Sequence, residues 1–182
     1  MESDTVKKTK EFFYKTVENF GGDTYGLVVH LPAVEKWANY LLKKYPEADK
    51  EVVMLSVWLH DIGHYPILKE DHAVTGEKVT RKFLKSIKID KEKIEKVAQC
   101  VRRHRCKDVQ PETIEEKMIA FSDSASHMTS PMYLDMTTAS EKIERDFRDL
   151  PLFPDIKEQL IPLYEAWKKL IAEYEKINKQ YS

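Results

Sequence analysis

The amino-acid sequence predicts an all-α fold, and three observations support this prediction. Apolar residues recur with a helical period from end to end, and no stretch keeps the alternation of a β-strand. Only five glycines occur in 182 residues. Glycine, proline and aspartate gather in short segments between the periodic stretches, where they favour turns. We therefore expect a bundle of helices without a sheet.

The expected helices follow one another with short connections. Their approximate ranges, in chain order, are 4–19, 26–44, 49–60, 73–87, 90–105, 111–127, 132–148 and 156–180. The connections read GGD (21–23), YPEAD (45–49), GHYPILKED (63–71), KID (88–90), VQPET (109–113) and LPLFPD (150–155). Because no linker or repeat separates the helices, we expect one domain over residues 1–182.

The third and the last of these helices differ in where their apolar residues lie. The segment VVMLSVWL (52–59) is apolar throughout and predicts a buried helix. The range 156–180 carries apolar residues at i, i+3 and i+4, and Pro162 is expected to kink this helix or to mark its start. We favour packing of this stripe on the rest of the domain over a dimer interface, and we expect a monomer or a homodimer.

Composition excludes several classes of partner. The chain has 30 basic and 31 acidic residues, so no overall field attracts nucleic acid or a membrane surface. The N-terminal segment is polar, and no apolar run approaches the roughly 18 residues of a membrane span. Two cysteines do not make a disulfide framework. We expect a cytoplasmic protein with no membrane contact and no clear nucleic-acid surface.

Four metal-competent side chains share helix faces with apolar residues. They are His30, His60, His104 and Asp123, each of which follows apolar residues at helical offsets or precedes them. One inward histidine is usually a core residue bonded to a carbonyl, but a single cation explains four such side chains more simply. His127, one turn after Asp123, is interpreted as a capping or surface residue, with donation to a carboxylate as the alternative.

The stretch WLHDIGHYP (58–66) ends the apolar third helix on His60 and Asp61. Burying an unpaired imidazole or carboxylate costs several kcal/mol, roughly, so a partner is required. Neighbours within a helix point about 100° apart. At a helix end, however, the second residue leaves helical geometry, and Gly63 allows a sharp exit. We therefore expect both side chains to turn toward one ion.

The ordered pattern H … HD … D, in HLPAVEKWA, LHDIGH and FSDSASH, resembles the HD superfamily of metal-dependent phosphohydrolases. His30, Val34 and Ala38 match its motif H-x-x-x-V-x-x-x-A, and HDIGH is close to the HDIG form. The resemblance covers about residues 24–128 and implies a helical bundle with a metal at its centre. We expect the helices of residues 132–181 to pack on this core. The resemblance also implies that one divalent cation is bound by His30, His60, Asp61 and Asp123.

A second metal is implied by resemblance to the two-metal branches of the superfamily. His72 with Gly76 is similar to their H-x-x-x-G segment, and His104 matches their other histidine. These two residues would bind a second ion, with Asp61 bridging, whereas the alternative makes His72 a helix-start or loop residue. Because Arg103 precedes His104 where a paired histidine is usual, and no GYP triplet is present, specificity for cyclic dinucleotides is not carried over.

The expected chemistry is attack of a metal-activated water on phosphorus. We predict that Asp61 orients or helps deprotonate this water. His64 is predicted to protonate the leaving oxygen or to bind phosphate, the alternative being an exposed loop histidine. Lys69, Arg103 and Arg105 are the predicted phosphate contacts.

The sequence thus predicts a phosphomonoesterase or phosphodiesterase that acts on a nucleotide or another small phosphate ester. The cofactor is expected to be one or two divalent ions of manganese, iron, cobalt, nickel or zinc. Two alternatives stay open, namely a di-iron oxygenase on the same fold and a non-catalytic sensor or scaffold that holds a metal.

Overall fold

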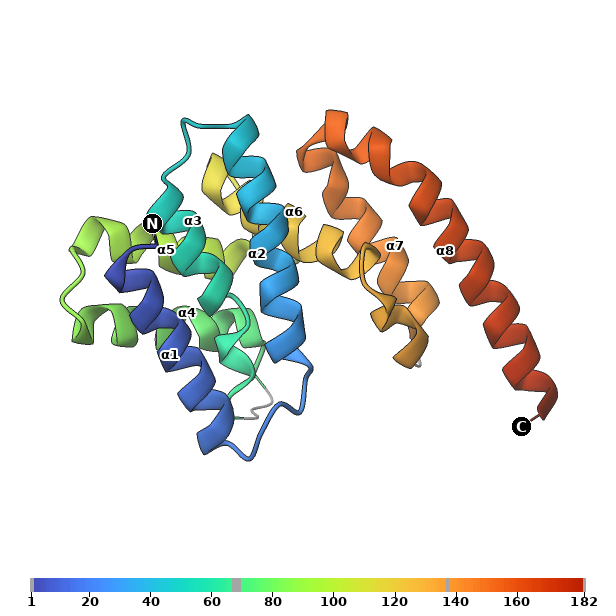
Figure 1. Ribbon diagram of the computed structural model, residues 1–182, viewed down its shortest axis with the longest axis horizontal. Coiled ribbons are helices and arrows are strands. Elements are labelled where there is room, and N and C mark those ends of the chain that lie inside the picture. The colour runs from blue at the N-terminus through green and yellow to red at the C-terminus, as the bar shows by residue number, and fades with distance from the viewer. Residues whose placement is uncertain (1, 67–69, 137, 182) are drawn as a thin grey trace. The chain divides into compact units, whose positions relative to one another are not determined.

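The computed structural model describes residues 2–66, 70–136 and 138–181 (Figure 1). No β-strand occurs in these ranges, so the all-α prediction is confirmed. The α-helices are α1 (Asp4–Asn19), α2 (Leu27–Lys44), α3 (Lys50–Leu59), α4 (His72–Ser86), α5 (Lys91–Arg103), α6 (Ile114–Met128), α7 (Ala139–Asp149) and α8 (Pro154–Tyr181). Three short 3₁₀ helices are η1 (Ile62–His64), η2 (Pro131–Asp135) and η3 (Leu150–Leu152). No helix in the described ranges is long and apolar enough to cross a bilayer.

The chain divides into two compact units, and the division falls inside α6. The first unit ends at Ser122 and the second begins at Asp123. The predicted single domain over residues 1–182, with residues 132–181 packed on the core, stays a prediction.

The core of the first unit is built around α3, which packs against α1, α2 and α5 (Figure 1). Every residue from 52 to 59 is buried, as the uniformly apolar sequence predicts. The helix begins where the Asp49 carboxylate accepts hydrogen bonds from the backbone N–H groups of Glu51 and Val52. Such a cap stabilises a helix by about 1 kcal/mol. A buried apolar helix therefore leads directly to His60.

Close packing of η1 against α4 brings the segment after α3 to the start of the next helix. Gly63 lies against Gly76, and a Cβ at Gly63 would overlap the backbone of both His72 and Gly76. Only glycine at Gly63 permits this approach. The contact places the end of α3 beside the first residue of α4.

In the second unit, α7 and α8 lie side by side (Figure 1). The rings of Phe147 and Tyr164 stack between them with centroids 3.8 Å apart. Buried Tyr133 of η2 meets Trp167 of α8 edge to face, and the Trp167 indole donates to the Met128 carbonyl at 2.8 Å. These aromatic contacts join α8 to the end of α6 and to η2.

One helix prediction in this unit is wrong. The expected helix 132–148 is interrupted, because Met136 takes an extended conformation (φ −102°, ψ 128°) and α7 begins only at Ala139. Pro162 lies inside α8, which excludes the alternative that it marks the start of this helix. In the C-terminal half of the apolar stripe, Ile171 is buried, whereas Leu170 and Tyr174 are about half exposed. Packing of the stripe on the rest of the domain stays a prediction.

Candidate metal centre

His60 and Asp61 follow the last residue of α3 and point toward the same place. The backbone of His60 is still helical (φ −59°, ψ −37°), whereas that of Asp61 has left the helix (φ −101°, ψ 5°). This change brings His60 Nε2 to 3.5 Å from Asp61 Oδ2. His60 is fully buried and Asp61 is 8% exposed, so both need partners within the protein.

One oxygen of Asp61 faces a first pair of histidines. His30, in the first turn of α2, has its Nε2 atom 3.3 Å from His60 Nε2 and 3.6 Å from Asp61 Oδ2. These three side chains are buried and offer two imidazole nitrogens and a carboxylate oxygen close enough to share one ion.

The other oxygen of Asp61 faces a second pair. His72, the first residue of α4, and His104, directly after α5, have their Nε2 atoms 3.2 Å apart. Asp61 Oδ1 lies 3.2 Å from His72 Nε2 and 3.6 Å from His104 Nε2. One carboxylate thus stands between two histidine pairs, with one oxygen toward each, and Asp61 belongs with each pair to a group of side chains that could hold an ion.

Backbone carbonyls fix the tautomers of two of these histidines. His60 Nδ1 donates to the Val57 carbonyl at 2.8 Å, and His104 Nδ1 donates to the Val101 carbonyl at 2.6 Å. With the proton on Nδ1, each ring presents the lone pair of Nε2 toward Asp61, as a metal ligand must. Both rings also lie at helix C-termini, where the partial negative charge of the last carbonyls favours a cation.

These particular carbonyl partners were not predicted from the sequence, although a signal for them exists. In both helices the pattern is V-x-x-H at the C-terminal end, as VWLH (57–60) and VRRH (101–104). A carbonyl three residues before a helix-ending residue is within reach of its side chain.

The environment keeps Asp61 ionised. Burial by itself raises the pKa of the Asp61 carboxyl, but the surrounding histidines, adjacent His60 first, outweigh burial and hold the pKa well below its usual value. The carboxylate is therefore available as an anionic ligand at neutral pH.

His64 borders this cluster without belonging to either pair. Its Nε2 atom lies 3.7 Å from Asp61 Oδ1. Its ring stacks on His72 with centroids 4.0 Å apart and makes a tilted contact with Tyr25 at 4.4 Å. Burial lowers the pKa of His64 to about 4, so the imidazole is neutral at pH 7. A neutral ring is suited to donating one hydrogen bond to phosphate, whereas protonation of a leaving oxygen requires the imidazolium.

The two predicted phosphate-binding arginines have partners within the protein. The Arg103 guanidinium donates to the Gln110 carbonyl at 2.6 Å and lies 2.7 Å from a Glu112 oxygen. Arg105 pairs with Asp71, the residue that caps α4. The Arg105 ion pair therefore ties the loop after His104 to the start of the helix that carries His72. Their contacts with phosphate stay predictions, and Lys69 lies outside the described residues.

Asp123 and His127 lie one turn apart on α6 in the second unit. His127 Nε2 is 3.5 Å from Asp123 Oδ1. His127 is only 7% exposed, so the interpretation as a capping or surface residue is wrong; its partners come from α7, which the local sequence does not reveal. The assignment of Asp123 as a metal ligand stays a prediction.

Near these residues, the carboxyl of Asp149 should make the stability of the folded chain depend on pH. Burial, followed by the charges of Asp123 and Asp146, raises its pKa from 3.8 to about 6 despite a hydrogen bond from Ser124. The folded chain therefore binds this proton more tightly than the unfolded chain, and the resulting stability is lost as pH rises through about 6.

We expect Asp149→Asn to stabilise the metal-free protein at pH 7.5 by about 2 kcal/mol, because the amide keeps an acceptor for Ser124 and carries no buried charge. At pH 4 the gain should vanish, since the native carboxyl is then protonated. Urea unfolding at both pH values measures the difference. An equal gain at the two pH values would contradict this account.

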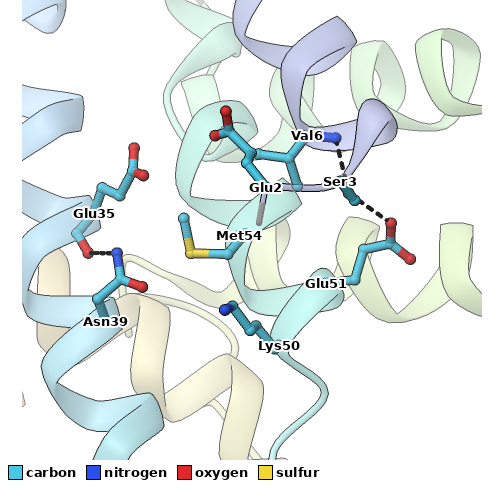
Figure 2. Close-up of a pocket in the computed structure, with 8 residues that line it drawn as sticks. All are labelled: Glu2, Ser3, Val6, Glu35, Asn39, Lys50, Glu51 and Met54. Atoms are coloured by element: carbon cyan, nitrogen blue, oxygen red, sulfur yellow. Dashed lines mark hydrogen bonds between the residues drawn. The ribbon is translucent and has the colours of Figure 1, made fainter.

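A separate pocket of about 400 Å³ lies between α1, α2 and α3 (Figure 2). Its lining residues are Glu2, Ser3, Val6, Glu35, Asn39, Lys50, Glu51 and Met54. None of them is a histidine, and its three carboxylates are engaged by lysines or serine, as in the Ser3–Glu51 hydrogen bond of 3.0 Å. This pocket therefore offers no donor set like that around Asp61.

Comparison with known proteins gives one family. The profile of the HD domain matches residues 27–128, which contain all the candidate metal ligands. No curated protein and no solved structure matches the chain.

Proposed function

The chain belongs to the HD domain family, and from this premise we propose that it is a metal-dependent phosphohydrolase acting on a nucleotide or another small phosphate ester. The observation that carries the proposal is the position of Asp61. Its two carboxylate oxygens each lie within 3.6 Å of a separate pair of imidazole nitrogens. Burying four histidines wholly or partly around one ionised carboxylate is costly unless a cation compensates these groups.

The donor set fits a divalent transition metal. Neutral imidazole nitrogens and carboxylate oxygens suit manganese, iron, cobalt, nickel and zinc. Structural metal sites usually depend on thiolates. Burial raises the pKa of the Cys100 thiol far above neutrality, so this cysteine stays protonated and does not supply a thiolate ligand. We assign one ion to His30, His60 and Asp61, with Asp123 as a further ligand, and a second ion to Asp61, His72 and His104.

The residues of the chain divide the work of hydrolysis. Bound divalent ions lower the pKa of a coordinated water toward 7 and polarise phosphoryl oxygens. Asp61 directs one carboxylate oxygen toward each histidine pair. It also accepts a hydrogen bond from the nucleophilic water. His64, which is neutral, donates its N–H to a phosphate oxygen at the edge of the cluster. The stacked ring of His72 and the tilted ring of Tyr25 restrain the plane of His64.

A di-iron oxygenase is the second candidate function, and the same carboxylate between two histidine pairs supports it. The arginines favoured phosphate in the sequence analysis, but Arg103 and Arg105 are engaged by Glu112 and Asp71. The same metal-binding side chains would serve phosphate-ester hydrolysis and oxygen activation by two irons, so an experiment must distinguish these two functions.

The test is metal analysis of the purified chain by mass spectrometry, followed by a phosphatase and phosphodiesterase panel with the metal found. We expect about two ions per chain and hydrolysis of at least one class of phosphate ester. Iron together with substrate-dependent oxygen uptake would instead establish the oxygenase. Normal metal binding with no hydrolysis and no oxygen uptake would favour a sensor or scaffold.

A further inference from the structure

The second unit contains a polar cluster of which the proposed function has used only one member, Asp123. It joins α6, η2 and α7 and consists of Asp123, His127, Tyr133, Lys142 and Asp146. Asp146 is 2% exposed and Tyr133 is fully buried. Burying a polar group is costly unless it is hydrogen-bonded, so each donor and acceptor in this cluster must have a partner.

The Lys142 ammonium determines which nitrogen of His127 carries the proton. Its Nζ atom lies 2.7 Å from His127 Nδ1 and also contacts Asp146. An ammonium group has donors only, so Nδ1 must accept. A neutral imidazole that accepts through Nδ1 carries its proton on Nε2.

The proton on Nε2 faces Asp123. His127 Nε2 lies 3.5 Å from Asp123 Oδ1 and is one turn away on the same face of α6. An imidazole N–H that faces Oδ1 restrains the rotation of the carboxylate. Partners of this kind orient ligands and tune metal affinity.

Asp146 holds Lys142 in place from the opposite side. Its Oδ1 atom contacts the ammonium, while its Oδ2 atom accepts a hydrogen bond of 2.7 Å from the Tyr133 hydroxyl. Burial, followed by the charge of Asp146, raises the pKa of Tyr133, so the hydroxyl keeps its proton and remains a donor. Each side chain in this hydrogen-bonded series, from Tyr133 to His127, therefore has only one set of donor and acceptor roles that fits its neighbours.

Resting on the proposed function, in which Asp123 is a metal ligand, we propose that Lys142 positions Asp123 by fixing the tautomer of His127. Without the ammonium, the imidazole proton moves to Nδ1, which lies 3.3 Å from Asp146 Oδ2. The lone pair of Nε2 then faces Asp123 Oδ1, and two acceptors oppose each other. Lys142 and His127 are therefore positioning residues that act through Asp123.

The first measurement reads the tautomer directly. Full-length, metal-free protein labelled with ¹⁵N at histidine is studied by long-range ¹H–¹⁵N correlation, with the His127 signals assigned by their absence in His127→Gln. We expect the Nε2–H tautomer in the wild type and in Lys142→Arg, which keeps donors at this position. Lys142→Met should show the Nδ1–H tautomer, a change that a purely structural role would not cause.

The second measurement is affinity for the metal found in the purified protein, by competition with a chelator. Lys142→Met should bind about 10- to 100-fold more weakly, and Lys142→Arg should recover most of this loss. Ser124→Ala is the matched control, because it removes a 2.9 Å hydrogen bond from α6 to Asp149 of α7 without touching His127. Its metal affinity should match the wild type.

The outcomes separate this inference from the proposed function. A Lys142→Met chain with the wild-type tautomer or wild-type affinity overturns the inference alone. Loss of a whole metal equivalent in His127→Gln also overturns it, because His127 would then be a ligand. Metal binding with the tautomer change but without hydrolysis overturns only the hydrolase. A wild-type chain that binds no metal overturns both.

Discussion

Asp61→Asn is expected to remove both metal ions and essentially all hydrolysis. A single carboxylate lies within 3.6 Å of both histidine pairs, so its replacement removes an anionic ligand from two ions at once. The amide has the same shape but only one oxygen and no charge. Without a bound ion the pKa of water returns from about 7 to 15.7, and we expect a rate loss on the order of 1000-fold or more.

His72→Ala is the informative comparison for this substitution. Its ring belongs to one pair only, so the variant should keep about one ion per chain while Asp61→Asn keeps none. Mass spectrometry of the purified variants measures metal content, and far-ultraviolet circular dichroism verifies that both remain helical. If Asp61→Asn retained two ions, or full activity, a shared carboxylate would be the wrong description of the centre.

Local sequence was sufficient for most helices, because their signals lie within a few residues. The apolar run 52–59 and the Asp49 cap define α3 without reference to the rest of the chain. The prediction failed at Met136, whose extended backbone ends η2 inside an apparently helical pattern. The exposure of Leu170 and Tyr174 could not be predicted from the sequence either, because periodicity shows that an apolar stripe exists but not which part of it is covered.

For the candidate site, helical offsets placed His30, His60 and His104 on inward faces, and all three are buried. The end of α3 explained how His60 and Asp61 reach one place. Periodicity could not show that the two oxygens of Asp61 face different histidine pairs, because that depends on how α4 packs against η1. Nor could it show that Asp146, nineteen positions after His127, buries that ring. Contacts between distant segments leave no local periodic signal.

Gly63→Ala tests the packing on which the second histidine pair depends. The added methyl group would overlap the backbone oxygen of His72 and the backbone nitrogen of Gly76, and would lie 2.9 Å from the Cα atom of Gly76. Backbone atoms cannot rotate away as side chains do, so η1 and the start of α4 must separate. We expect a loss of about 3 kcal/mol in stability, which for a chain of this size lowers the melting temperature by about 10 °C.

The same separation should move His72 away from Asp61, so Gly63→Ala is expected to bind about one ion per chain. Gly76→Ala is the control, because its added methyl group meets first the Val101 side chain at 3.0 Å and lies 3.4 Å, an ordinary van der Waals distance, from backbone atoms of Gly63 and His60. Its packing cost is offset by a gain in helix propensity of about 1 kcal/mol within α4. Calorimetry and metal analysis should therefore rank the wild type and Gly76→Ala together, well above Gly63→Ala. Equal stability and metal content in all three proteins would show that close packing of η1 on α4 does not build the centre.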